Sequence, residues 1–194
     1  ENSNFFVTLN NGTHNTTYVL TLFEVLTPEQ LPFYLELMQH LAIKGIPVPR
    51  PYADQQGQLF RPLAGKPATL VSKLSGSDTA APTPAHCASV GRTLAQMHLA
   101  GRDLQRHQPN LRGLDWWQMM EDKVSAFLPD HIAELLRDEV AAQTAFAQTP
   151  TYKNLPIGAG HCDLFVDNVL FTDPDSPSFI DFYFAGIDTW LFDL

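Results

Sequence analysis

The stretch of sequence that decides the fold is HCDLFVDN at residues 161–168, which is followed by IDF at residues 180–182. Apolar runs at residues 169–171 and 179–182 predict two short β-strands, and the turn signal DPD at residues 173–175 separates them. A hairpin built from these strands would bring the end of the first motif next to the second. We therefore expect both motifs to contribute to one site.

Three polar side chains of these motifs suit the transfer of a phosphoryl group from a nucleotide. This reaction needs a group that accepts the proton of the attacking hydroxyl, oxygen ligands for Mg²⁺, and a cover for the phosphate chain. The carboxylate of Asp163 could accept the proton, while Asn168 and Asp181 offer hard oxygen ligands for Mg²⁺. Taken singly, Asp163 could be a capping carboxylate and Asn168 a turn residue, but their joint spacing favours the site.

His161 has two interpretations. It could bind a metal together with Asp163, but no second His or Cys stands at ligand spacing nearby. We expect instead that His161 is a structural brace, which holds the loop through a backbone hydrogen bond.

The composition excludes several classes of protein. The chain has 194 residues, of which 44% are hydrophobic, so it can bury a substantial core. Its 12 Lys and Arg against 21 Asp and Glu give a net charge of −9, which argues against a nucleic-acid partner. No apolar run reaches the roughly 20 residues that span a bilayer, and the start, ENSN, does not resemble a signal peptide. We therefore expect no membrane partner. Because Cys87 and Cys162 form no metal or redox motif, we expect a cytoplasmic protein.

The first part of the chain predicts a small antiparallel sheet. Runs rich in aromatic and β-branched residues at 4–9 and 18–23 flank the turn signal NNG at residues 10–12, which indicates a hairpin. Two further strands are expected at residues 58–60 and 68–74.

One helix belongs to this part. Thr27 is the expected N-cap, with Pro28 at the first helical position and Gln30 in the capping-box position. Apolar residues at helical spacing continue to Leu41, and Gly45 is expected to close the helix in a left-handed conformation.

The rest of the chain predicts mainly helices. A stretch rich in Ser, Gly, Pro and Ala at residues 75–84 indicates a hinge between two lobes. A helix is expected to begin at Thr83-Pro84, and two more at residues 116–127 and 132–146. The pattern predicts a two-lobed α+β protein.

Four further residues are candidates for the site. Asn4 could approach the nucleotide phosphates, or be an ordinary polar residue of an edge strand. Lys73 precedes the expected hinge, where backbone groups would recognise adenine. The guanidinium of Arg112 could clamp the carboxylate of an amino-acid substrate, or form a surface ion pair. His98 ends an apolar helical face, which favours a core histidine.

The loop at residues 161–168, IDF at 180–182 and GRTLAQMH at 91–98 together resemble the aminoglycoside phosphotransferase and choline kinase-like superfamily. Residues 161–168 are similar to the H-x-D-x-x-x-x-N loop of this superfamily. Residues 180–182 are similar to its counterpart of the metal-binding Asp-Phe-Gly of protein kinases, and residues 91–98 to its Gly-x-x-Leu-Ala-x-x-His signature. Several stretches are more narrowly similar to the homoserine kinase branch of this superfamily. These are ENSNFFV at residues 1–7, YVLTLFE at 18–24, LPFYLELM at 31–38, MHLA at 97–100, LRGLDWW at 111–117 and DFYFA at 181–185.

This resemblance implies a protein-kinase-like two-lobed fold. A small antiparallel-sheet lobe with one helix would bind the nucleotide (residues 1–75), and a mainly helical lobe would provide catalysis and acceptor binding (residues 76–194). The resemblance implies ATP and Mg²⁺ as cofactors, with Asp163 as the catalytic base that binds the substrate hydroxyl, and Asn168 and Asp181 as the metal ligands. The implied reaction is ATP-dependent phosphorylation of the hydroxyl of L-homoserine, in threonine biosynthesis.

The chain departs from the family pattern in several places. Most of the phosphate-covering glycine-rich turn would precede Asn2, and relatives continue beyond residue 194 with further helices, so we expect a piece of a longer protein. The position of the phosphate-binding Lys of kinases is Thr21 here, which leaves phosphate anchoring unassigned and Glu36 without its usual partner. The resemblance also implies that His98 is a structural brace.

Three other functions remain open at this point. Another kinase of the same superfamily could act on choline, an amino sugar or an aminoglycoside, and a highly acidic acceptor pocket would favour it. A catalytically silent nucleotide-binding module is a second alternative. A metal-dependent hydrolase is the third, and it rests only on His161 and Asp163.

Overall fold

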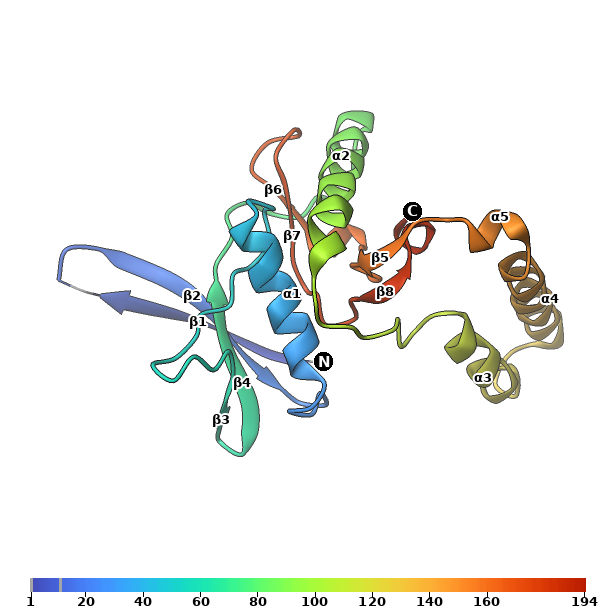
Figure 1. Ribbon diagram of the computed structural model, residues 1–194, viewed down its shortest axis with the longest axis horizontal. Helices are drawn as coiled ribbons and strands as arrows, with labels where there is room; N and C mark the ends of the chain where they lie inside the picture. Colours follow the sequence, from blue (N-terminus) through green and yellow to red (C-terminus); the bar gives the residue numbers. More distant parts are fainter. Residues whose placement is uncertain (1, 11) are drawn as a thin grey trace. The chain divides into compact units, whose positions relative to one another are not determined.

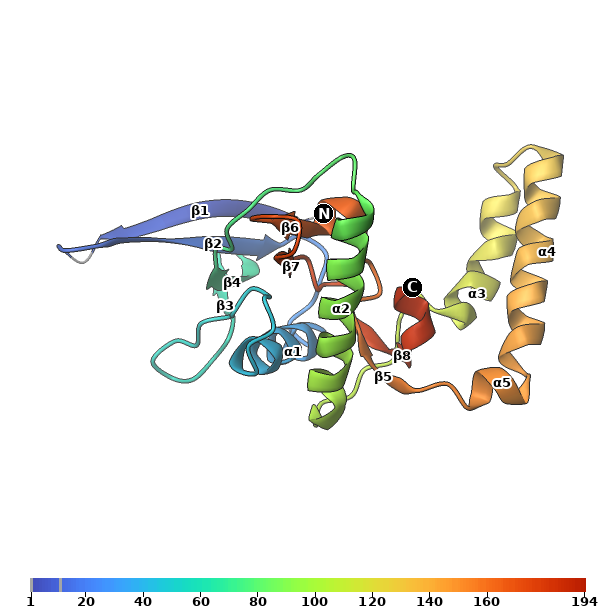
Figure 2. The ribbon, with the colours of Figure 1, turned by 90° about the horizontal axis from the view of Figure 1, so that it is seen from above.

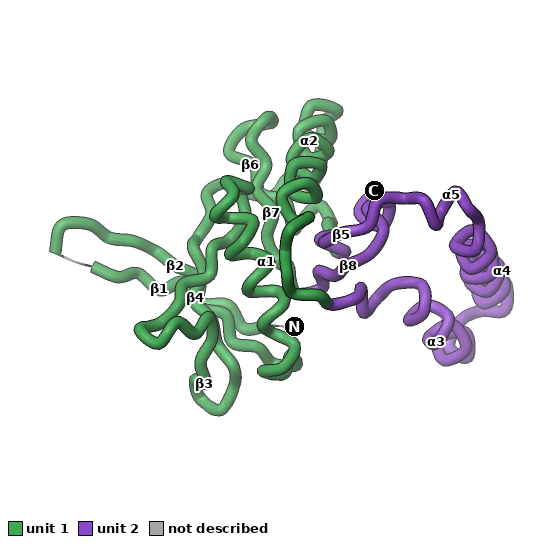
Figure 3. The backbone as a smooth tube through the Cα atoms, in the orientation of Figure 1, with its two compact units in different colours: residues 1–107, 163–183 green, residues 108–162, 184–194 purple. Residues whose placement is uncertain are grey.

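The computed structural model of the chain describes residues 2–10 and 12–194 (Figure 1). The chain divides into two compact units, each built from two segments (Figure 3). Unit 1 contains residues 1–107 and 163–183, and unit 2 contains residues 108–162 and 184–194. The expected lobe boundary at residues 75–76 lies inside unit 1 and stays a prediction.

Unit 1 contains an antiparallel sheet of four strands in the order β1-β2-β4-β3. Helix α1 lies along one face of this sheet (Figure 2). The elements of unit 1 are β1 (Asn2–Asn10), β2 (Asn15–Phe23), α1 (Leu31–Ile43), β3 (Arg61–Leu63), β4 (Lys66–Ser72), α2 (Pro84–Ala100), β6 (Val169–Phe171) and β7 (Pro177–Phe179), with 3₁₀ turns at Gly101–Asp103 and Val166–Asn168. Its largest fully buried side chains include Phe23, Leu31, Leu35, Leu37, Met38, Leu41, Met97, Phe179 and Phe182.

The hairpin predicted from residues 4–9 and 18–23 is confirmed as β1 and β2. The two strands pair antiparallel, and Asn4 lies opposite Thr21. Residue 11 of the predicted turn lies outside the described residues. On β2, Thr21 and Phe23 alternate with less buried neighbours and turn the same face inward, as the period of two in a strand requires.

The predicted start of α1 at Thr27-Pro28 is wrong by one turn, because the helix begins at Leu31. Thr27 and Gln30 still make a local contact, in which the Thr27 backbone N–H donates to Gln30 Oε1 at 3.0 Å. Pro32 explains the shift. The Leu31 N–H donates to the Thr27 carbonyl at 3.3 Å, but Pro32 has no N–H to donate to the carbonyl of residue 28, so the second regular bond of a helix that started at Pro28 would be missing.

The predicted end of α1 is confirmed, and two strand boundaries need correction. Gly45 adopts a φ of +83° and closes the helix. The strand expected at 58–60 lies at residues 61–63 instead, and the Leu59 carbonyl accepts a hydrogen bond from the Thr69 hydroxyl at 2.7 Å rather than from a strand neighbour. The strand expected at 179–182 ends at residue 179, because Asp181 has a φ of +63°, which a strand cannot accommodate.

The expected hinge includes a segment that is bonded to β6 within unit 1. The backbone of Ser77 exchanges two hydrogen bonds with Phe171, at 3.2 and 2.8 Å. Gly76 makes this approach possible, because a Cβ there would lie 2.6 Å from the Phe171 carbonyl oxygen, and its φ is +106°. Helix α2 then begins at Pro84 with Thr83 as its N-cap, as predicted.

Unit 2 consists of helices and one small pair of strands. Its elements are α3 (Leu114–Ser125), α4 (Asp130–Ala147), α5 (Pro150–Lys153), β5 (Ile157–Gly160) and β8 (Gly186–Thr189), with a 3₁₀ turn at Trp190–Asp193. The helices expected at 116–127 and 132–146 are confirmed as α3 and α4, whereas the antiparallel pair β5–β8 was not predicted. Within the described residues, no helix is long and apolar enough to cross a lipid bilayer.

Candidate active site

Asp163 and Asn168 lie together at the end of the loop before β6. The Asn168 Nδ2 donates to the backbone oxygen of Asp163 at 2.7 Å and lies 3.4 Å from its carboxylate oxygen Oδ2. The same backbone oxygen accepts the N–H of Phe165 at 2.9 Å. Both Asp163 and Asn168 are half-buried. The loop therefore folds on itself through local bonds and fixes the two side chains next to each other.

The β6–β7 hairpin brings Asp181 to the same place, as the sequence predicted. Asn168 directly precedes β6, and Ile180 directly follows β7, with Val169 opposite Phe179. The N–H of Ile180 donates to the carbonyl of Asn168 at 3.0 Å. Asp181 therefore follows the residue that is bonded to Asn168, and its side chain is exposed.

These oxygen donors fit a Mg²⁺ ion that also binds a nucleotide. Because Asn168 turns its amide nitrogen toward Asp163, its amide oxygen faces away from that carboxylate. No group of three or more His, Cys, Asp or Glu side chains among residues 2–10 and 12–194 could hold a metal ion. Mg²⁺ in phosphoryl-transfer enzymes is typically bound by one or two carboxylates together with phosphates and water. The small set of Asn168 and Asp181 suits this mode rather than a site closed by protein alone.

A second polar cluster of unit 1 was not predicted from sequence. The Thr21 hydroxyl is buried and donates to Asn4 Oδ1 at 2.7 Å. Burial raises the pKa of the Tyr183 phenol, a hydrogen bond with Thr21 works in the opposite direction, and the carboxylate of Asp181 raises the pKa further. Thr21, at the position expected of a lysine, is thus bonded to Asn4, its partner across the β1–β2 pair.

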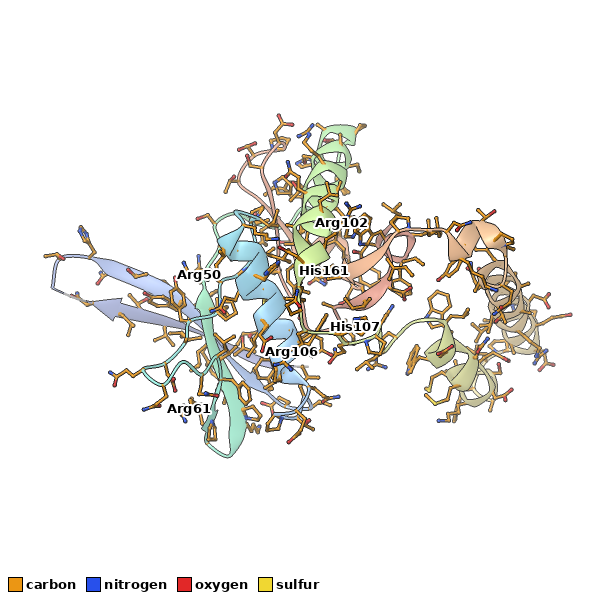
Figure 4. All side chains as sticks on the ribbon, in the orientation of Figure 1. Arg50, Arg61, Arg102, Arg106, His107 and His161 are labelled. Atoms are coloured by element: carbon orange, nitrogen blue, oxygen red, sulfur yellow. The ribbon has the colours of Figure 1, made fainter. Side chains whose placement is uncertain are left out.

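Glu36 and Lys73 have partners that the sequence did not indicate. Arg106 donates to Glu36 Oε2 at 2.7 Å beside α1 (Figure 4), so an arginine 70 residues along the chain pairs with this glutamate. The Lys73 ammonium lies 5.5 Å from the ring centroid of Phe6, a cation–π distance. Lys73 is exposed directly after β4, and its predicted place beside the nucleotide stays a prediction.

In unit 2, Asp193 holds the two residues that precede Asp163 in the sequence. The backbone N–H of His161 donates to Asp193 Oδ2 at 2.9 Å, and that of Cys162 donates to Oδ1 at 2.7 Å. Cys162 has a φ of +61°, which is unfavourable for a residue with a Cβ. His161 is completely buried. Asp193 was missed in the sequence because nothing in its spacing points to the loop, and the expected role of His161 as a brace stays a prediction.

Arg112 is held by aromatic rings of unit 2. Its guanidinium lies 4.8 Å from the ring centroid of Trp116 and 5.3 Å from that of Phe184. Its backbone N–H donates to Asn110 Oδ1 at 2.9 Å, and Asn110 in turn donates to Asp188 Oδ2 at 2.9 Å. None of the ion pairs found among the described residues includes Arg112.

The turn that carries Arg112 borders a cavity of about 650 Å³ within unit 2. Asn110 and Gly113 line this cavity, together with the carboxylates of Asp115 and Asp188 and apolar side chains of α3, α4 and β8. Its volume exceeds that of a single amino acid. A ligand there would meet both acidic and apolar groups.

His98 lies in α2 and is only 5% exposed. This burial agrees with the expected core histidine, and its role as a brace stays a prediction.

Comparisons with known proteins show the family of the chain. The profile of the phosphotransferase enzyme family matches residues 1–194. The chain is 52% identical, over its whole length, to a protein of Paraburkholderia phymatum named homoserine kinase, and it covers 61% of that protein. It is 53% identical over its whole length to a protein of Polaromonas naphthalenivorans with the same name, and covers 60% of it. The chain thus spans about three fifths of the length of these curated relatives.

A solved structure shows the fold. The amicoumacin kinase hAmiN, in complex with AMP-PNP, Ca²⁺ and Ami, matches 97% of this chain with a TM-score of 0.71 and 16% sequence identity, and the match covers 58% of that kinase. The predicted α+β, kinase-like fold is confirmed by this likeness.

Proposed function

Because the chain belongs to the phosphotransferase enzyme family, we propose that it transfers the terminal phosphoryl group of ATP to the hydroxyl of L-homoserine. The observation that carries this proposal is the identity of 52% and 53%, over the whole chain, to two proteins named homoserine kinase. The product would be O-phospho-L-homoserine, an intermediate of threonine biosynthesis. A cytoplasmic setting is proposed together with this function.

Asp163 is the proposed catalytic base. Its carboxylate would accept the proton of the homoserine hydroxyl as the oxygen attacks phosphorus. The contacts of Asn168 with the Asp163 backbone and carboxylate fix the direction in which the acid group points. A positioned base of this kind contributes about 10²–10⁴-fold to the rate.

Asn168 and Asp181 are the proposed ligands of Mg²⁺. The hairpin bond between Ile180 and Asn168 sets the spacing of the two side chains before any ligand arrives. The ion, when bound with the nucleotide, would offset the negative charge of the phosphates. Asn4 and Lys73 are proposed to contribute to nucleotide binding. Asn4 lies near the start of β1, and the ammonium group of Lys73 directly follows β4.

Arg112 is proposed to bind the carboxylate of homoserine. Its guanidinium carbon lies over the Trp116 and Phe184 rings, which restrict its position, and its N–H groups would donate to a carboxylate in a bidentate manner. Its turn borders the cavity of unit 2, which is large enough for an amino acid. His161 and His98 are proposed as structural braces.

The test is an acceptor panel with the purified protein and Mg-ATP, in which ADP release is followed with homoserine, serine, choline and kanamycin. We expect homoserine to give the highest kcat/KM. In the same assay, Arg112→Gln should raise the KM for homoserine about 10- to 100-fold, because hydrogen bonds between charged groups are lost. Arg137→Gln removes an exposed arginine of α4 and serves as the matched control. Turnover with choline or kanamycin alone would refute the proposed acceptor, and the lack of any nucleotide binding would refute the kinase function.

A further inference from the structure

The segment before α3 is fixed on β8 by backbone hydrogen bonds. The N–H of Asn110 donates to the carbonyl of Ile187 at 3.0 Å, and the N–H of Ile187 donates to the carbonyl of Gln108 at 2.8 Å. Gly186 permits this approach, because a Cβ there would lie 2.5 Å from the Cα of Asn110. These bonds anchor Asn110 beside Asp188, the next residue of the strand.

The side chain of Asn110 joins Asp188 to the turn of Arg112. Its Nδ2 donates to Asp188 Oδ2 at 2.9 Å, and its Oδ1 accepts the backbone N–H of Arg112 at 2.9 Å. The second bond spans two residues, as in an Asx-turn. Gly113 lets this turn come close to β8, because a Cβ there would lie 3.1 Å from Asp188 Oδ2. One neutral side chain therefore connects a residue that carries a carboxylate to a residue that carries a guanidinium.

Asp188 is suited to bind a cationic group in the cavity of unit 2. It is half-buried and lines this cavity, and no Lys, Arg or His is among the described residues of the lining. Besides the bond from Asn110, its Oδ1 accepts the backbone N–H of Thr189 at 2.7 Å. A carboxylate offers about four acceptor positions, and these two bonds use two of them. The carboxylate is thus held in place and can still accept further hydrogen bonds.

Asp115 is the other carboxylate of the lining and is less suited to this task. It is exposed and lies in the first turn of α3. A negative side chain there is favourable to the helix itself, because the N-terminal end carries a partial positive charge. The presence of Asp115 is therefore explained without a ligand.

We infer that Asp188 binds the α-ammonium group of the amino-acid substrate and selects for it, with Asn110 as its positioning residue. The inference rests on the proposed function, in which Arg112 binds the carboxylate of homoserine. The ammonium and carboxylate groups of an amino acid are attached to one carbon atom, so the side chains that bind them must lie near each other. The bonds of Asn110 to both Asp188 and the Arg112 turn meet this requirement.

The test compares substrates that lack one of the two charged groups. ADP release by the purified protein with Mg-ATP is followed with homoserine, with 4-hydroxybutanoate, which has no amino group, and with 2-aminobutane-1,4-diol, which has no carboxylate. We expect the parent to prefer homoserine over 4-hydroxybutanoate at least about 100-fold in kcat/KM, because a site built to bind a polar group rejects the analogue without it. If turnover of 4-hydroxybutanoate is too slow to follow, its inhibition constant against homoserine replaces kcat/KM.

Two variants should give opposite patterns. Asp188→Asn should lower the preference for homoserine over 4-hydroxybutanoate about 10- to 100-fold, mainly by raising the KM for homoserine, because a charged hydrogen bond is lost with that substrate alone. Arg112→Gln should weaken the use of homoserine and of 4-hydroxybutanoate but spare the diol. A merely structural role of Asp188 would instead lower kcat/KM for all three substrates by the same factor.

Further variants complete the comparison. Asp122→Asn removes an exposed carboxylate of α3 that does not line the cavity, and it should leave every kcat/KM unchanged. Asn110→Ala removes the bond that directs Asp188, so it should lower the preference for homoserine about tenfold. If Asp188→Asn fails to fold, Asn110→Ala decides alone.

Three results would overturn the inference. The first is a parent-like preference in Asp188→Asn, the second is an equal loss with every substrate, and the third is a loss of preference in Asp115→Asn but not in Asp188→Asn. A parent protein that uses homoserine and 4-hydroxybutanoate equally well would also overturn it and leave the proposed function intact. A parent protein that does not phosphorylate homoserine at all would contradict the proposed function itself.

Discussion

The chain passes from unit 2 to unit 1 between Cys162 and Asp163, and the residues on the two sides of this point are held in different ways. On the unit 1 side, Asp163 and Asn168 are held by bonds inside the loop, across five residues. On the unit 2 side, His161 and Cys162 are held by the carboxylate of Asp193, which stands more than 30 residues further along the chain.

The two kinds of contact place two different parts of the loop. Residues that would perform the chemistry are placed by short-range bonds and by one small hairpin, so their geometry is largely contained in the motif itself. The backbone that leads to them is placed by a charged group from a distant segment. Charge-assisted bonds to two successive N–H groups can hold Cys162 at a φ of +61° that the loop would not adopt alone. Substitutions on the two sides should therefore affect different measured quantities.

A large effect on the rate is expected at the hairpin. Asp181→Asn removes the only charged member of the proposed metal pair, and a metal ligand supports several kcal/mol of transition-state stabilisation, so turnover at millimolar Mg²⁺ should fall about 100-fold or more. The free energy of unfolding should change little, because the Asp181 side chain is exposed. Kinetics across a Mg²⁺ series and urea unfolding check the two statements. Asp173→Asn, in the exposed turn between β6 and β7, is the control, and an equal loss there would show that the hairpin rather than the ligand was disturbed.

A smaller effect on rate and a larger one on stability are expected at Asp193. Asp193→Asn keeps one acceptor oxygen but loses the charge, so one of the two N–H groups loses its partner and the free energy of unfolding should fall by about 2–4 kcal/mol. Urea unfolding measures the change. Asp138→Asn, an exposed residue of α4, carries the same loss of charge and should stay within about 0.5 kcal/mol of the parent. If Asp193→Asn unfolds like the parent, the carboxylate does not hold the loop.

The sequence predicted the parts of the site that depend on local bonds. The apolar run of β6 matches the structure, and the hairpin brings Asn168 and Asp181 together as expected. Thr83 begins α2 as predicted, because a cap is a local contact. In contrast, nothing in the spacing of Asp193 indicates the loop that it holds, since these contacts form only after distant segments pack.

Weak local sequence signals account for the other elements in which the structure differs from the prediction. Three of the four residues of β5, with the sequence IGAG, are Gly or Ala, which have little strand preference, and β8 is recognisable only as its partner. Gly186 in β8 is required by the fold rather than by a turn, because a Cβ there would lie 2.5 Å from the Cα of Asn110. The start of α1 was misplaced because Pro28 and Pro32 both suit a first helical turn, and Pro32 lacks the N–H that would continue a helix begun at Pro28.

The most direct test of the proposed chemistry compares two aspartates of one loop. Formation of O-phospho-L-homoserine from Mg-ATP and homoserine is followed by ³¹P NMR for Asp163→Asn and for Asp167→Asn, an exposed neighbour in the same loop. We expect Asp163→Asn to lower the rate about 10²–10⁴-fold, as for the loss of a positioned base, while Asp167→Asn retains the parent rate. A parent-like rate in Asp163→Asn, or an equal loss in both variants, would contradict the assignment of Asp163 as the catalytic base.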